Sequence, residues 1–318
     1  MKNIKHHNLP LVSIIIPVYN GSNYMKEAID SALSQTYPNI EVLVVNDGSC
    51  DDGKTEKIAL SYGEKIRYFI KPNGGVSSAL NYGLREMKGE FFSWLSHDDV
   101  YTPEKIYRQM SVADEKSIVM CGRKLIDEKS NIIGEINIGK HFKQDCELNC
   151  AEAFAELYDQ GCFNGCALLI PKKAFDSIGC FDESLRYCQD LLMWTKLFLG
   201  GYGLRFLSFD GVLSRVHDKQ LTNTGKALYY GDCKYLSDVV LSDICEKSDE
   251  KINLLYHFAK YNAKYYNKSV FDACIYRGRV SGLLKFRHIF ALRLIRMYGS
   301  VRPFLRQIYY KLIKRIAV

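Results

Sequence analysis

This sequence of 318 residues lacks long apolar runs, paired cysteine motifs and acidic residues near its C-terminus. No stretch approaches the ~20 consecutive apolar residues that span a bilayer, and the polar first ten residues lack the apolar core of a signal peptide. We therefore expect a cytoplasmic protein. The composition, 47% hydrophobic and 25% charged, excludes a disordered chain and allows one large domain with a smaller appendage.

The eleven cysteines are odd in number and scattered, several of them in apolar contexts. Cys146 and Cys150 lie four residues apart, as do Cys162 and Cys166, but no further Cys or His pair follows at the spacing of a zinc ribbon. We therefore expect reduced thiols and no structural zinc.

Acidic residues are missing from the last part of the chain. Residues 277–318 contain eleven of the 43 Lys and Arg and none of the 36 Asp and Glu. The first 276 residues therefore carry a net charge of about −4, although the whole chain carries +7. A mildly acidic body argues against nucleic acid as a partner.

Strand-like and helix-like segments alternate along the first hundred residues. Short apolar runs predict buried strands at residues 12–16, 41–45, 66–70 and 90–95, and helices are expected at 22–35 (capped by Ser22), 52–62 and 77–87. This alternation predicts an α/β fold with a parallel sheet that helices cover on both faces. Ligands of such sheets bind beyond the carboxyl ends of the strands, where Asn20, Asp47, Asn73 and Asp98 lie.

The alternation loosens beyond residue 103. We expect helices up to about 114 and at 152–158 and 189–199, strands at 117–121 and 167–170, a polar hairpin-like region up to 140, and two edge strands at 204–209 and 212–216. Beyond residue 224 the sequence predicts helices alone.

Two adjacent carboxylates, Asp98 and Asp99, directly follow an apolar strand-like run. Neighbouring anions repel each other, and each needs water, a cation or a hydrogen-bond donor. A divalent cation that carries phosphate satisfies both carboxylates, because such cations prefer oxygen ligands. The sequence therefore predicts a metal and phosphate site here.

Six motifs follow one another in the order and spacing of a known enzyme family. They are residues 12–20 (VSIIIPVYN), 44–49 (VVNDGS), 73–83 (NGGVSSALNYG), 94–99 (WLSHDD), 189–190 (QD) and 215–220 (RVHDKQ). Together they resemble the family 2 glycosyltransferases, over roughly residues 9–225. The resemblance implies the GT-A fold, a Rossmann-like, mostly parallel sheet flanked by helices, in a catalytic domain at 1–225 (donor-binding half about 9–100, acceptor half about 101–225). A helical C-terminal region would follow at 226–318.

The resemblance implies an inverting enzyme that moves a sugar from a nucleotide-sugar donor, most simply a UDP-sugar, to an acceptor hydroxyl. The implied donor-binding residues are Pro17, Tyr19, Asn20, Asp47, Asn73, Gly75, Ser96, His97 and Asp98. Pro17 and Tyr19 would form a flat wall beside the base, and Asp47 would accept the uracil N3–H. The alternatives are a turn-forming role for Asp47 and an ordinary loop at residues 73–75.

The resemblance also implies that Asp98 and His217 bind Mg²⁺ or Mn²⁺, which neutralises charge on the departing UDP. Asp190 would be the catalytic base that takes the proton of the acceptor hydroxyl. The alternatives are an N-cap aspartate at position 190 and a structural histidine at position 217. Trp194 and residues 163–165 are expected to line the acceptor side.

Three positions depart from the family pattern. Ser96 replaces the first Asp of the D-x-D element, Leu80 replaces an Arg, and Gln189 replaces the Glu before the catalytic Asp, which should make Asp190 less basic. These departures leave open a catalytically silent nucleotide-sugar-binding scaffold. A nucleotidyltransferase is a further alternative, although residues 17–20 do not form a Gly-rich, basic phosphate loop.

The basic tail predicts amphipathic helices at 284–296 and 302–314. Such helices suit an anionic membrane surface. We therefore expect a peripheral position at the inner face of the membrane, and a glycan or lipid-linked glycan acceptor in cell-surface polysaccharide or glycolipid synthesis. The alternative is that the C-terminal helices cover the core or form a homo-oligomer.

Overall fold

The computed structural model describes residues 9–136, 141–160, 163–218, 220, 232, 235, 236, 238–244, 251–264, 268–280, 289, 292 and 293. The chain divides into two compact units. The first comprises Met1–Ala153 and Cys162–Asp232, and the second comprises Phe154–Gly161 and Cys233–Val318.

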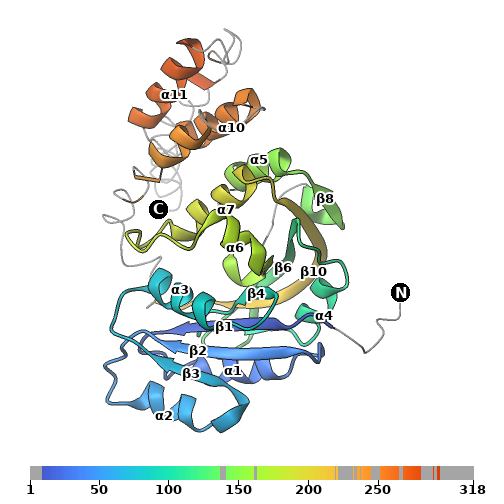
Figure 1. Cartoon of the computed structure of the whole chain (residues 1–318), viewed down its shortest axis with the longest axis vertical. Helices are drawn as coiled ribbons and strands as arrows, with labels where there is room; N and C mark the ends of the chain where they lie inside the picture. Colours follow the sequence, from blue (N-terminus) through green and yellow to red (C-terminus); the bar gives the residue numbers. More distant parts are fainter. Residues whose placement is uncertain are drawn as a thin grey trace, which may run out of the picture. The chain divides into compact units, whose positions relative to one another are not determined.

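Four parallel strands open the first unit, in the spatial order β3-β2-β1-β4. They are β1 (Val12–Val18), β2 (Ile40–Asn46), β3 (Arg67–Ile70) and β4 (Phe91–Trp94). Helices α1 (Met25–Leu33) and α2 (Lys54–Leu60) lie on one face of these strands, and α3 (Val76–Glu86) lies on the other (Figure 1). Every residue of β1 is buried, because the strand is covered on both faces. The predicted parallel α/β half is confirmed.

The sheet continues beyond β4 in the order β9-β6-β10-β5. The strands are β5 (Val100–Tyr101), β6 (Ser117–Ile126), β9 (Leu168–Pro171) and β10 (Gly203–Arg215). Strand β9 is antiparallel to both of its neighbours, and β10 is parallel to β6. Two further strands pair antiparallel at the side, β7 (Ile132–Glu135) with β6 and β8 (Cys146–Leu148) with β10.

The prediction of two separate edge strands near residues 204–216 is wrong. One strand of 13 residues, β10, covers the whole region and pairs with β5, β6 and β8. Its register against β6 shifts between Leu207 and Val212. Asp210 and Gly211, which lie at this irregularity, separated the two predicted strands in the sequence pattern.

The remaining helices of this unit flank the second half of the sheet. They are α4 (Lys105–Met110), α6 (Lys172–Ile178), α7 (Gln189–Leu199) and the first part of α5 (Cys150–Gln160). Helix α1 begins at Met25 with Tyr24 as its N-cap, so the predicted cap at Ser22 is wrong.

The structure also places Trp194 in the core, fully buried, with its indole N–H donating to the Phe163 carbonyl oxygen at 3.0 Å. Trp194 and Phe163 therefore do not line an acceptor surface.

The second unit contains α10 (Lys251–Lys264) and α11 (Lys268–Val280). Its core includes edge-to-face contacts of Tyr158 with Phe258 and with Tyr261. Among the described residues no helix has the length and apolar character needed to cross a bilayer. The predicted amphipathic tail helices at 284–296 and 302–314 lie outside the described residues, apart from positions 289, 292 and 293.

Candidate functional site

Tyr19 and Asn20 follow the end of β1 at the rim where the parallel strands end. The Asn20 amide N–H donates to Ser49 Oγ at 2.9 Å, and Asn20 Oδ1 accepts from the Cys50 amide at 2.8 Å. Tyr19 is 46% exposed, as a side chain that stacks on a ligand must be. Pro17, in contrast, is buried inside β1 because the strand extends two residues beyond its predicted end. Tyr19 is therefore the exposed ring of the predicted wall.

Asp47 follows β2 and binds the loop before α3. Its carboxylate accepts hydrogen bonds from the backbone N–H groups of Gly74 (3.0 Å) and Gly75 (2.7 Å) and from Lys71 Nζ (2.7 Å). Asn73 Nδ2 donates to the Asp47 carbonyl oxygen at 2.9 Å. Gly75 has φ +88°, a conformation that side chains other than glycine rarely adopt. The structure therefore brings Asp47, Asn73 and Gly75 together.

Asp98 and His217 are in direct contact. His217 Nε2 lies 3.0 Å from Asp98 Oδ2, although the two residues are 119 positions apart. Both side chains are largely buried, and the His217 ring lies 5.3 Å from the ring of Tyr24. The loop after β4 and the end of β10 thus meet, as the proposed metal pair requires.

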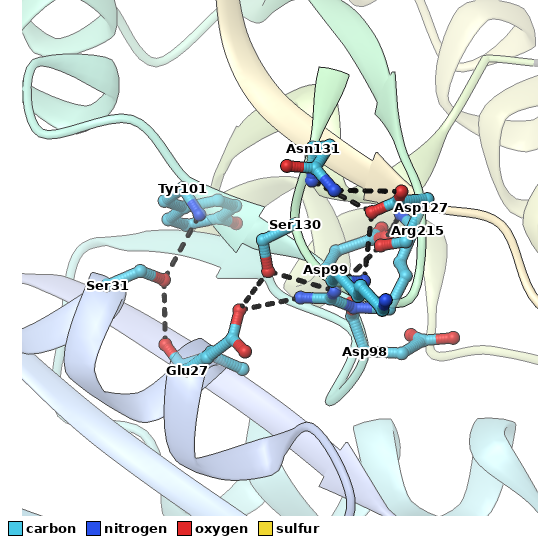
Figure 2. Close-up of polar contacts among 11 residues, drawn as sticks. Glu27, Ser31, Asp98, Asp99, Tyr101, Asp127, Ser130, Asn131 and Arg215 are labelled. Carbon is cyan, nitrogen blue, oxygen red and sulfur yellow. Dashed lines mark hydrogen bonds and ion pairs between the residues drawn. The ribbon is translucent and has the colours of Figure 1, made fainter. Parts of the chain in front are cut away.

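The two adjacent carboxylates face different surroundings. Asp99 is buried, and its Oδ1 accepts a hydrogen bond from the Arg215 backbone N–H at 2.9 Å. Burial raises the pKa of Asp99 to about 7. Figure 2 shows the Asp98 side chain pointing away from Arg215 and its partners. Asp98 is therefore the carboxylate that faces His217, and Asp99 is the inward one.

Ser96 and His97 turn toward protein groups. The Ser96 amide donates to Cys166 Sγ, and Cys166 Sγ donates to Ser96 Oγ, both at 3.3 Å. The His97 ring packs against Gly21, where an added Cβ would lie 2.6 Å from His97 Cδ2. Burial lowers the pKa of His97, which favours a neutral ring.

Asp190 lies in the first turn of α7, two residues after the N-cap Cys188. Its Oδ1 accepts from the Leu191 amide at 2.7 Å. Because Cys188 occupies the N-cap, the alternative that Asp190 is the N-cap is wrong. The preceding residue, Gln189, is 7% exposed. Within the described part of the chain its Oε1 has no hydrogen-bond partner. A buried amide oxygen without a partner lowers the stability of the fold, and a ligand hydroxyl could donate the missing hydrogen bond.

The segment before α7 lies against the donor loop. A Cβ at Gly75 would be 3.0 Å from Arg186 Nη1. Asn81 on α3 donates to the Phe181 carbonyl oxygen at 2.9 Å and accepts from the Phe181 amide at 2.9 Å. These contacts tie α3 to the chain that leads into Asp190.

Asp98 and His217 supply only part of the ligands that a divalent cation needs. Among the described residues no three His, Cys, Asp or Glu side chains gather as a cation site. Asp98 and His217 offer one oxygen and one nitrogen at close range. Mg²⁺ is commonly held by one or two protein ligands together with substrate phosphates. The pair therefore fits a cation that a bound diphosphate completes.

Two charged residues at this rim had no role assigned from the sequence, Lys71 and Arg215. Lys71 contacts the Asp47 carboxylate, and Arg215 contacts the Asp98–Asp99 loop. The position of Arg215, two residues before His217 at a strand end, was visible in the sequence. Its burial was not, because arginine is rarely buried.

The chain is similar in sequence to proteins of one enzyme family. Residues 13–160 match the model of glycosyl transferase family 2. A glycosyltransferase of Rickettsia typhi is 50% identical over 240 residues, which cover 72% of this chain and 73% of that protein. Chondroitin synthase of Pasteurella multocida is 43% identical over 102 residues, 31% of this chain and 10% of that protein. The chain spans only 35% and 32% of two other Rickettsia relatives.

The fold also matches a solved structure. The crystal structure of S. aureus TarS 1-349 in complex with UDP-GlcNAc superposes with a TM-score of 0.67 at 18% identity, covering 93% of this chain and 91% of that one. At this identity the match shows the fold, the curled α/β sheet of the GT-A enzymes. The sequence matches establish that the chain belongs to glycosyltransferase family 2.

Proposed function

We propose that this enzyme transfers a sugar with inversion from a UDP-sugar to a hydroxyl group of a glycan or lipid-linked glycan, with Mg²⁺ or Mn²⁺ as cofactor. The observation that carries the proposal is the 3.0 Å contact between Asp98 and His217 at the strand-end rim. The TarS complex with UDP-GlcNAc supports a UDP-sugar donor. Chondroitin synthase, as a relative, supports a role in polysaccharide or glycolipid synthesis.

The donor would bind along the rim. Tyr19 supplies an exposed ring for stacking on the base, and Asp47 Oδ2, which accepts one amide N–H, can also accept the uracil N3–H. The Asn73–Gly75 backbone lies close to Asp47 and leaves no side chain in the way at Gly75. Asn20, Ser96 and His97 border the same rim.

The cation would be held by Asp98 and His217 and by the donor diphosphate. When bound, it stabilises the negative charge that grows on the leaving UDP. Asp190 accepts the proton of the acceptor hydroxyl while that oxygen forms a bond to the anomeric carbon. The bond from this carbon to the diphosphate oxygen breaks in the same step, so the anomeric configuration inverts.

The helical region at residues 226–318 would serve a different purpose from the catalytic domain at 1–225. Its eleven cations and missing acids in residues 277–318 support attachment to an anionic membrane surface, at the inner face of the membrane. Deleting residues 281–318 should abolish co-sedimentation with anionic vesicles. Unchanged co-sedimentation would contradict this attachment, and a loss of homo-oligomers would favour the assembly role instead.

The catalytic proposal is tested with Asp190→Asn. The variant should lose ~10²–10⁴-fold in transfer rate and keep its UDP affinity, because the amide cannot take a proton. Asp176→Asn, at an exposed position of α6, is the matched control and should behave as wild type. Equal turnover in Asp190→Asn and wild type would refute the assigned base.

A donor screen separates the remaining alternatives. UDP-sugars, but not GDP-sugars, should raise the melting temperature, and the shift should grow with Mn²⁺. Stabilisation by GDP-mannose alone would refute the role of Asp47 at uracil. A wild-type protein that binds donor without any turnover would be the silent scaffold. Release of pyrophosphate from UTP in the presence of a sugar 1-phosphate, with formation of the UDP-sugar, would indicate a nucleotidyltransferase.

A further inference from the structure

We propose that Arg215 is the positioning residue of the cation site: it holds the Asp98–Asp99 loop so that the Asp98 carboxylate faces His217. The inference rests on the proposed cation-dependent function and deepens it. Arg215 itself does not touch the donor or the cation in this proposal. It acts through the backbone and side chains that surround Asp98.

The Arg215 guanidinium is fully buried and reaches three segments of the chain. Its Nε donates to the Asp98 carbonyl oxygen at 2.9 Å, and its Nη1 donates to the Asp127 carbonyl oxygen at 2.9 Å. Its Nη2 forms an ion pair with Glu27 Oε2 at 2.7 Å. Figure 2 shows this convergence of the loop after β4, the β6–β7 turn and α1 on one side chain.

Arg215 forms hydrogen bonds with both Asp98 and Asp99, through different atoms. Its backbone N–H binds the Asp99 carboxylate, and its side chain binds the Asp98 carbonyl oxygen. Asp99 is thereby turned inward, which leaves the Asp98 carboxylate on the side of His217. Because His217 follows Arg215 by two residues, one short segment fixes both members of the candidate metal pair.

Arg215 also contacts two residues of α1, its N-cap Tyr24 and Glu27 in its first turn. The Arg215 guanidinium carbon lies 4.4 Å from the centre of the Tyr24 ring, which also contacts the His217 ring. Glu27 Oε2 accepts from Ser130 Oγ at 2.7 Å as well as from Arg215. The orientation of His217 and the path of the Asp98 loop therefore depend on one connected set of contacts.

A purely structural explanation accounts less well for this arrangement. Removing a guanidinium from water is costly, and an apolar side chain would fill the same volume without that cost. Fixed outer contacts, however, are what a cation site with only two protein ligands needs, because they orient the ligands before the cation binds. Arg215 contacts the Asp98 carbonyl oxygen directly, and the Tyr24 ring beneath its guanidinium contacts the His217 ring.

The test is the gain in UDP affinity that Mn²⁺ produces, measured by calorimetry with Mn²⁺ and with EDTA. In Arg215→Lys the charge remains, but one ammonium cannot reproduce the planar fork that reaches three segments. The Mn²⁺-dependent gain should fall by about 10–100-fold. The UDP affinity in EDTA should stay within about twofold, because the Asp47 side of the site is untouched.

Arg205→Lys is the matched control. Arg205 lies on the same strand, β10, and also forms ion pairs, with Asp114 at 2.7 Å and with Glu147. Its ion-pair partners do not belong to the Asp98–Asp99 loop, so the Mn²⁺-dependent gain should equal that of wild type. Glu27→Gln, which keeps Arg215 and weakens its anchor, should give an intermediate gain and replaces Arg215→Lys if that variant does not fold.

The outcomes separate this inference from the proposed function. A wild-type protein without any Mn²⁺-dependent gain overturns the cation proposal and the inference together. A normal wild-type gain that survives in Arg215→Lys, or in Glu27→Gln where that variant is used, overturns the inference alone. Equal weakening of UDP binding in EDTA and in Mn²⁺ would show general structural damage and would also overturn it.

Discussion

Lys71 Nζ lies 2.7 Å from Asp47 Oδ1 in a pair whose side chains are only 12% and 5% exposed. The same distance separates Lys26 Nζ from Asp30 Oδ2, but those side chains are 71% and 49% exposed. Burial therefore distinguishes two ion pairs of equal length. A buried carboxylate depends on its partners much more than an exposed one does, because water cannot replace them.

We expect Lys71→Met to lower the free energy of unfolding by about 1–3 kcal/mol, since Asp47 keeps its two amide donors but loses the ammonium. Lys26→Met should cost at most about 1 kcal/mol, as exposed pairs contribute little. Urea denaturation of both variants measures the difference. Equal losses would show that burial does not govern the Lys71 pair.

Lys105 predicts a pH dependence of stability. Its ammonium is fully buried, donates to Ser93 Oγ (3.0 Å) and Gln109 Oε1 (2.9 Å), and lies over the Tyr101 ring. Burial lowers the pKa of Lys105 from 10.5 to about 8. Between these values the unfolded chain binds a proton that the folded chain lacks, so the free energy of unfolding should rise with pH.

The comparison with Lys105→Met isolates this effect. Relative to the variant, wild type should gain roughly 1–3 kcal/mol in the free energy of unfolding as the pH rises from about 7.5 to about 10. Urea denaturation across this range measures the gain. Lys88→Met at an exposed position should show none. A difference between wild type and Lys105→Met that stays constant with pH would contradict the lowered pKa.

The position of Gly165, beside the site, has no room for a larger side chain. A Cβ there would lie 2.6 Å from Trp94 Cζ3, closer than side-chain carbons approach. Gly165→Ala should therefore displace Trp94 and lower the free energy of unfolding by about 1–3 kcal/mol. In Gly134→Ala the new Cβ meets nothing closer than Leu125 Cδ1 at 3.9 Å, so this control should be nearly neutral. Thermal unfolding compares them, and a neutral Gly165→Ala would contradict the close contact.

We predict that replacing Ser96 with Asp raises the affinity for a divalent cation. Ser96→Asp places a third carboxylate beside Asp98 and Asp99, which should tighten Mn²⁺ binding by about tenfold because the number of charged ligands rises. Without cation, repulsion should lower the free energy of unfolding by ~1–2 kcal/mol. Thermal unfolding with increasing Mn²⁺ tests both effects. Ser111→Asp at an exposed position is the control, and equal behaviour of the two variants would contradict the prediction.

The sequence predicted the first half of the fold better than the second. The runs in β1 and β2 are nearly continuous and apolar, a pattern typical of a strand covered on both faces. In β10 the burial pattern is broken at Ser208 and Asp210, and the register shifts there. A local pattern cannot distinguish such an irregularity from the end of a strand, and one long strand was predicted as two.

The candidate site shows the same limit in its side chains. That Tyr19, Asp47 and Asp98 follow strand ends could be read from the order of elements. That Pro17 and Trp194 are buried could not, because both burials depend on neighbours far along the chain. Asp190 was placed at a helix start correctly, but its distance from the N-cap, two residues, required the backbone.

The sequence by itself determined which polar residues gather at one rim, because parallel strands point the same way and their carboxyl ends share an edge. Tertiary structure alone decided which of them touch: His217 with Asp98 across 119 residues, Lys71 with Asp47 across 24, and Arg215 with Glu27 across 188. Such contacts require that several elements bring two side chains within about 3 Å. No local periodicity encodes that distance, since it results from the packing of the whole sheet.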